Sequence, residues 1–80
     1  MSGPVVVDAR GLRCPAPVIR LARAAADAPA GAELTVLATD PAAVHDVPAW
    51  ARMRGHQMVS ATEDGGVHAL TVRLGGGSAS

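Results

Sequence analysis

The sequence lacks lysine, phenylalanine and tyrosine, and it contains one cysteine and one tryptophan. A single cysteine excludes an internal disulfide, and a free thiol is best kept in a reducing cytoplasm, where we expect this protein to work. All seven basic residues are arginines, and they balance seven acidic residues, so the formal net charge is zero. The chain has no basic stripe of the kind that binds nucleic acid, and we expect no direct nucleic-acid binding.

Long apolar runs are missing as well. No stretch approaches the roughly 20 residues of a membrane span, and no signal peptide is visible, so we expect no membrane insertion. Eighty residues make one small domain. Because Trp50 is the only large aromatic residue, aliphatic side chains and alanines must build the core. We expect a monomer with one domain over residues 4–74 and a flexible Gly/Ser tail over residues 75–80.

Hydrophobic periodicity and turn residues predict six elements in the order β-α-β-α-β-β. Pro48 falls inside the second helix and should kink that helix or split it into two pieces. Asp64-Gly65-Gly66 is a good hairpin signal between the last two strands. The predicted strands cover residues 4–9, 33–38, 58–63 and 67–74, and the predicted helices cover residues 15–28 and 41–54.

This order predicts an α/β fold: a two-layer α/β sandwich with a mixed four-stranded sheet and two helices on one face. A strand, a crossover helix and a second strand imply parallel pairing with a right-handed connection. The carboxyl ends of two parallel strands lie at one edge of the sheet. Cys14 follows the first strand and Asp40 follows the second, so we expect both at that edge. Asp40 is predicted first as a cap of the second helix.

The junction after the first strand concentrates unusual chemistry around Cys14. A helix N-terminus favours a thiolate over a thiol, and Arg10 and Arg13 should act in the same direction. Pro15 suits the first helical position, but Pro15 and Pro17 remove two backbone donors. We therefore expect the pKa of Cys14 to be lowered to near neutrality.

The stretch Asp8-Ala9-Arg10-Gly11-Leu12-Arg13-Cys14-Pro15-Ala16-Pro17 resembles the signature of the TusA-like (SirA) family of small sulfur carriers, marked by Cys-Pro-x-Pro at the first helix. The resemblance continues through Asp40-Pro41-Ala42 and Asp46-Val47-Pro48 to Gly55-His56. It implies that Cys14 carries sulfur as a persulfide, taken from a cysteine desulfurase or rhodanese and passed to an acceptor protein. Such a protein transfers sulfur but is not a stand-alone enzyme. Ala16 departs from relatives that have an acidic residue between the two prolines.

The candidate site therefore centres on Cys14, with no cofactor and no metal. The residues expected to support it or to contact partners are Arg10, Gly11, Leu12, Arg13, Pro15, Pro17 and Asp40. The three histidines lie eleven and twelve residues apart and do not match the close spacing of a zinc site.

Several alternatives stay open. Cys14 is incidental if the domain is a binding or regulatory module, and a thiol-redox enzyme is a third possibility that the absence of a second cysteine disfavours. Trp50 is either the largest core residue or an anchor at a partner surface. The resemblance leaves the pathway open among transfer-RNA thiolation, molybdenum-cofactor assembly, sulfur oxidation, thiosulfate uptake and selenium handling.

Overall fold

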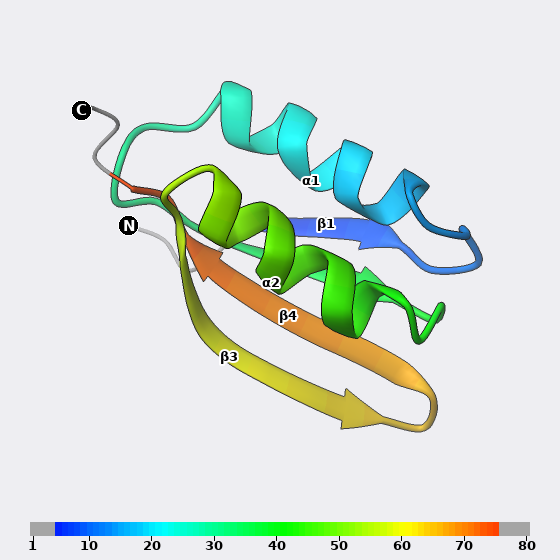
Figure 1. The fold of residues 1–80 in the computed structure, drawn as a ribbon. Coiled ribbons are helices and arrows are strands. Elements are labelled where there is room, and N and C mark those ends of the chain that lie inside the picture. The colour runs from blue at the N-terminus through cyan, green and yellow to red at the C-terminus, as the bar shows by residue number, and fades with distance from the viewer. Residues whose placement is uncertain (1–4, 76–80) are drawn as a thin grey trace.

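The computed structural model describes residues 5–75 and contains the six predicted elements in the predicted order (Figure 1). The boundaries differ from the predicted ones by a few residues, as is usual where helix and strand ends fray. The elements are β1 (Val5–Ala9), α1 (Ala16–Ala26), β2 (Glu33–Ala38), α2 (Ala43–Met53), β3 (Gln57–Asp64) and β4 (Val67–Arg73).

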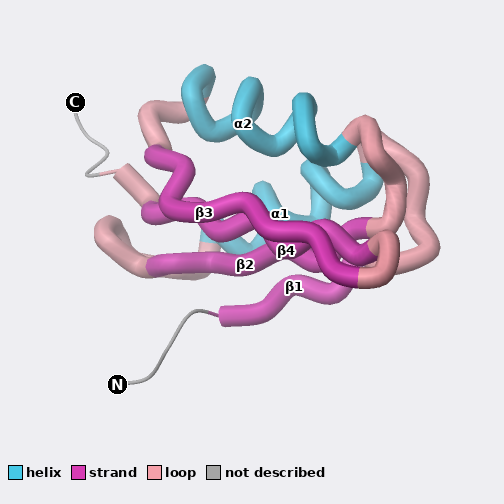
Figure 2. The backbone as a smooth tube through the Cα atoms, turned by 90° about the horizontal axis from the view of Figure 1, so that it is seen from below, coloured by secondary structure: helices cyan, strands magenta, loops and turns pink. Residues whose placement is uncertain are grey.

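The four strands form one mixed sheet in the order β1-β2-β4-β3. β1 pairs with β2 in parallel, and the β2–β4 and β3–β4 pairs are antiparallel. Both helices cover the same face of the sheet, as Figure 2 shows from below. The predicted two-layer sandwich with a mixed sheet is therefore confirmed.

The core lies between the sheet and the two helices. β2 alternates strictly, with Leu34, Val36 and Ala38 at most 1% exposed on the helical side. Leu21 of α1 and Val47 of α2 are fully buried against this layer. Trp50 is 7% exposed and belongs to the same cluster, so of the two alternatives for Trp50 the structure supports the core residue.

Two helix predictions need correction. α2 runs without a break from Ala43 to Met53 although Pro48 lies inside it, so the helix is not split. A proline removes only one intrahelical hydrogen bond, and Val47 and Ala51 pack into the core on either side of it. The second helix also starts later than predicted, because Pro41 and Ala42 form a turn closed by a hydrogen bond from the Ala43 N–H to the Asp40 carbonyl (3.0 Å).

The end of the described chain is bonded to the domain. Gly75, which the sequence assigned to the tail, donates its N–H to Nδ1 of His56 at 2.9 Å. The rest of the predicted tail, residues 76–80, lies outside the described residues. No helix among residues 5–75 has the length and the apolar character needed to cross a membrane.

Candidate functional site at the carboxyl edge of β1 and β2

The structure brings Cys14 and Asp40 together, as the parallel pairing of β1 and β2 predicts. The Cys14 N–H donates a hydrogen bond to Oδ2 of Asp40 at 2.8 Å. Oδ1 of the same carboxylate accepts a hydrogen bond from the Ala42 N–H at 3.0 Å. These two bonds, that from Cys14 first, lower the pKa of Asp40. One carboxylate thus joins the β1–α1 turn to the β2–α2 turn.

Asp40 is therefore not the helix cap that the sequence predicts. α2 begins at Ala43, its N-cap position is Ala42, and no side chain caps it. Asp40 lies before that position and bonds the turn that leads into the helix. Its geometry identifies it as a residue that positions the Cys14 backbone.

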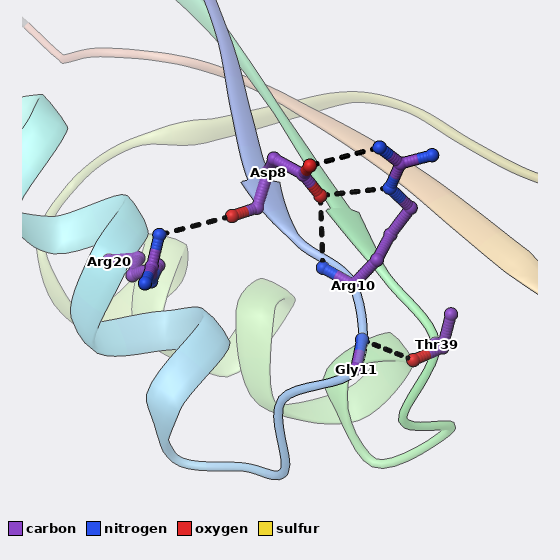
Figure 3. A network of polar contacts seen from close by, with 5 residues as sticks. All are labelled: Asp8, Arg10, Gly11, Arg20 and Thr39. Carbon is purple, nitrogen blue, oxygen red and sulfur yellow. Dashed lines mark hydrogen bonds and ion pairs between the residues drawn. The ribbon is translucent and has the colours of Figure 1, made fainter.

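A second bond joins the same two turns. The Gly11 N–H donates to the Thr39 hydroxyl oxygen at 2.9 Å (Figure 3). Gly11 has a φ of 80°, a left-handed conformation that glycine adopts without the steric cost of a side chain. The Leu12 N–H then bonds back to the Ala9 carbonyl at 3.2 Å, and the Leu12 side chain packs against the core. The turn before Cys14 is thereby fixed at both ends.

Arg10 is engaged with Asp8 and does not act on the thiol. Its Nε and Nη2 atoms each lie 2.9 Å from an Asp8 carboxylate oxygen, and its backbone N–H donates to the same group at 3.1 Å (Figure 3). These hydrogen bonds lower the pKa of Asp8 to about 2. Asp8 thus ties the turn that presents Cys14. Arg20 of α1 reaches the Asp8 carbonyl at 3.4 Å.

The environment of the Cys14 thiol contradicts the predicted lowering of its pKa. Partial burial is the largest cause that raises it, followed by a hydrogen bond from the thiol to the Asp46 carboxylate and by the negative charges of Asp46 and Asp40. Together they raise the pKa of Cys14 to about 11. At neutral pH the unloaded site therefore contains a thiol.

The start of α1 offers the sulfur little compensation. Pro15 is the N-cap residue and Pro17 lies in the first turn, and neither has an N–H. The Ala16 N–H is donated to the Arg13 carbonyl at 2.8 Å. Three consecutive residues therefore contribute no free N–H to the sulfur, which is why the expected thiolate-stabilising helix end is weak.

Asp46 is the residue that the sequence analysis left without a role. It was part of the resembling stretch Asp46-Val47-Pro48, and it lies in the first turn of α2. The Asp46 N–H donates to the Ala42 carbonyl at 2.9 Å. Ala42, whose own N–H donates to Asp40, therefore lies one helical turn before Asp46. The sequence signal that could have pointed to Asp46 is a second acidic residue soon after Asp40. Its proximity to Cys14 could not be predicted, because it depends on how α2 packs beside the β1–α1 turn.

A shallow pocket of about 410 Å³ opens beside this junction. Three of the predicted supporting residues line it together with Asp40. Pro15 and Pro17 do not line it: Pro15 is exposed at the start of α1, and Pro17 is buried on the side of α1 that faces the core. The pocket is lined by Gly11, Leu12, Arg13, Thr39, Asp40 and Pro41.

The histidines lie elsewhere. Among residues 5–75, no group of three His, Cys, Asp or Glu side chains is arranged to hold a metal ion. His56 instead accepts the Gly75 N–H and packs its ring against Trp50, with ring centroids 5.0 Å apart.

Known proteins resemble this chain over almost all of its length. The family described as Sulfurtransferase TusA matches residues 5–74. YrkI of Bacillus subtilis is 35% identical, with 94% of this chain and 100% of YrkI covered. Sulfur carrier protein TusA of Pseudomonas paraeruginosa is 37% identical, with 91% and 95% covered.

A solved structure supports the same assignment. The SirA-like protein of Desulfitobacterium hafniense superposes with a TM-score of 0.79 at 33% identity, covering 89% of this chain and 97% of that protein. A match of this extent in both sequence and fold, with the cysteine at the junction after β1, shows that the chain belongs to the TusA family.

Proposed function

We propose that this protein is a sulfur carrier that accepts sulfur as a persulfide on Cys14 from a donor protein of the desulfurase or rhodanese type and passes it to an acceptor protein. The observation that carries the proposal is the position of Cys14 in a chain of this family. It is the only cysteine and it is half-buried. Hydrogen bonds from the N–H groups of Gly11 and Cys14 to the side chains of Thr39 and Asp40 fix the turn that presents it at a surface edge.

The chemistry requires only one sulfur atom of the carrier in each step. In loading, the Cys14 thiolate attacks the outer sulfur of the donor persulfide, and the donor sulfur–sulfur bond breaks with its electron pair on the donor thiolate. The proton of Cys14 is released to water. In unloading, an acceptor thiolate attacks the outer sulfur of the Cys14 persulfide and Cys14 leaves as a thiolate. The transferred sulfur keeps its oxidation state, so no external oxidant or reductant is consumed.

The turns around Cys14 fit protein partners better than small molecules. The pocket beside Cys14 is shallow and open, and Arg13 and Gly11 at its rim are exposed. A small substrate is usually enclosed in a deeper, mostly apolar pocket. An exposed edge of this kind gives a partner's persulfide-bearing segment direct access to the sulfur.

Mass spectrometry tests the proposal. The protein is incubated with a cysteine desulfurase and cysteine, or with a rhodanese and thiosulfate. We expect the wild type to gain the mass of one sulfur atom in a form that a reductant removes. Cys14→Ser should gain none, because a hydroxyl does not accept sulfur from a persulfide.

The result also separates the carrier from a binding module. A module in which Cys14 is incidental keeps its function after Cys14→Ser, whereas the carrier loses it. A wild type that stays unmodified with both donors would contradict the proposal. We propose that the protein works in the cytoplasm as a monomer. Size-exclusion chromatography coupled to light scattering measures its oligomeric state.

A further inference from the structure

A second hollow lies away from the Cys14 edge, where the two helices end. α1 and α2 pack side by side, and both end at the side of the molecule opposite to the β1–α1 turn (Figure 1). The hollow between these ends has a volume of about 260 Å³ and is lined by Ala22, Ala25, Ala26, Trp50, Arg54 and His56. Pockets for small molecules usually start at about 300 Å³. The hollow therefore suits one side chain of another protein better than a small-molecule substrate.

Trp50 has its ring in the core but keeps a polar atom at the surface. The residue is 7% exposed, and its indole N–H donates to no group among residues 5–75. No enclosed side-chain nitrogen or oxygen in that part of the chain lacks a partner, so the indole nitrogen is not enclosed and meets solvent. Because Trp50 lines the hollow, its N–H is available there, and an indole nitrogen can only donate.

His56 adds a second donor to the same hollow. Its Nδ1 accepts the Gly75 N–H at 2.9 Å, so the proton of the neutral ring is on Nε2. The ring is also held against Trp50, with centroids 5.0 Å apart and planes inclined by 49°. The only polar atom that the neutral ring can still offer to a partner is therefore an N–H.

Arg54 supplies the positive charge. It is exposed, and it takes part in neither of the two ion pairs found among residues 5–75. No acidic residue lines the hollow, and Asp27, which follows α1, lies outside it. Helix ends carry partial negative charge, but hydrogen bonds engage carbonyls of the last turn of α2. The Trp50 carbonyl accepts the Arg54 N–H at 3.0 Å. The Ala51 carbonyl accepts the His56 N–H at 2.7 Å.

We propose that this hollow is a docking site for an acidic segment of a partner protein, whose glutamate or aspartate side chain lies among Trp50, Arg54 and His56. The three side chains offer donors and a positive charge but no acceptor, and an ionised carboxylate is an acceptor only, with two oxygens that can take several hydrogen bonds. The Cys14 edge lies at the other end of the helices and stays uncovered (Figure 1). A partner can thus hold the protein without blocking the thiol. The inference does not depend on sulfur chemistry at Cys14.

An NMR titration tests the site, because the single tryptophan gives one indole N–H signal. The isotope-labelled full chain is titrated with acetyl-Gly-Glu-Gly-amide and, separately, with acetyl-Gly-Gln-Gly-amide, which has nearly the same size but no charge. We expect the glutamate peptide to shift the indole signal to saturation and the glutamine peptide to leave it in place. No saturable shift with the glutamate peptide, or equal shifts with both peptides, would overturn the proposal.

Arg54→Gln tests the role of the positive charge and keeps the backbone N–H that bonds the end of α2. We expect the dissociation constant of the glutamate peptide to rise about fivefold, as for the loss of one partly exposed ion pair. Arg52→Gln is the matched control, since Arg52 is also exposed in the last turn of α2 but does not line the hollow. Equal weakening by both variants would reveal only a general attraction between opposite charges and would contradict the site. Far-ultraviolet circular dichroism checks that each variant retains its fold.

Sodium acetate tests whether the occupant is a segment of a protein. We expect acetate to saturate the indole shift only at a higher concentration than the glutamate peptide, because the peptide also buries its methylene groups against the alanines of α1. Acetate that binds as tightly as the peptide would rule out a protein segment as the preferred occupant. These titrations follow binding only, so they remain decisive even if sulfur loading of Cys14 fails, an outcome that would contradict the carrier function instead.

Discussion

The Cys14 N–H donates a 2.8 Å hydrogen bond to the Asp40 carboxylate, and this bond connects the two turns that follow the parallel strands β1 and β2. It places the Cys14 backbone relative to the sheet without involving the thiol. A carboxylate can accept two such bonds at once, and Asp40 does so with the N–H groups of Cys14 and Ala42. Cys14 is therefore presented by a turn whose position is set by the neighbouring strand.

Asp40→Ala removes this acceptor from two backbone N–H groups. We expect amide hydrogen exchange at Cys14 to become faster and the unfolding temperature to fall, because both N–H groups lose their protein partner. Glu63→Ala is the matched control, since Glu63 also accepts a backbone bond, from Gly66 at 2.8 Å, but in the β3–β4 hairpin. Equal protection of the Cys14 amide in wild type and Asp40→Ala would show that the bond does not position the cysteine.

The Asp8 carboxyl should titrate with a pKa of about 2, below its ordinary value of 3.8, because it accepts hydrogen bonds from Arg10. Because the pKa of Asp8 is lowered in the folded protein, the stabilisation that the Asp8–Arg10 pair gives the fold is fully present above pH 3.8 and is lost as the pH falls through about 2. Carboxyl-carbon NMR shifts measure this titration. Arg10→Gln should return the midpoint toward the ordinary value, and a midpoint that does not move would rule out Arg10 as the cause.

Pro17→Ala tests what the second proline of the motif does. Its ring is fully buried, so the variant loses about two methylenes from the core and gains freedom in the unfolded chain. We expect a loss of about 2 kcal/mol of unfolding free energy. Urea unfolding followed by Trp50 fluorescence measures it.

The same variant restores an N–H in the first turn of α1. We expect the midpoint of the pH dependence of Cys14 alkylation to fall in Pro17→Ala because that N–H can donate to the anion. A midpoint that rises or does not change would show that Pro17 serves packing alone.

The bond between His56 and Gly75 predicts that the folded domain extends to Gly75. Gly75→Ala should lower the unfolding free energy, because a Cβ at this position would collide with the Gly55 carbonyl oxygen. His56→Phe should cost about 1 kcal/mol through the loss of the acceptor. The two effects should be less than additive, since both break the same contact. Strict additivity in urea unfolding would contradict a shared contact.

Local patterns in the sequence were sufficient for the fold and for the position of the cysteine. The alternation of Leu34, Val36 and Ala38 marks a strand with one face in the core, and Asp64-Gly65-Gly66 marks the hairpin. Parallel pairing across a helix then places Cys14 and Asp40 at one edge. These conclusions follow from periodicity, turn chemistry and connection handedness, all of which act between residues close in sequence or within one crossover.

The chemical state of the thiol was decided by the tertiary structure. The sequence places Arg10, Arg13 and a helix start beside Cys14, and by proximity along the chain these predict a lowered pKa. In the folded protein the Arg10 side chain pairs with Asp8. Burial, followed by the carboxylate of Asp46 from a helix much later in the chain, raises the pKa of the Cys14 thiol. A pKa depends on distance in space and on burial. Neither quantity exists until α2 packs beside the β1–α1 turn.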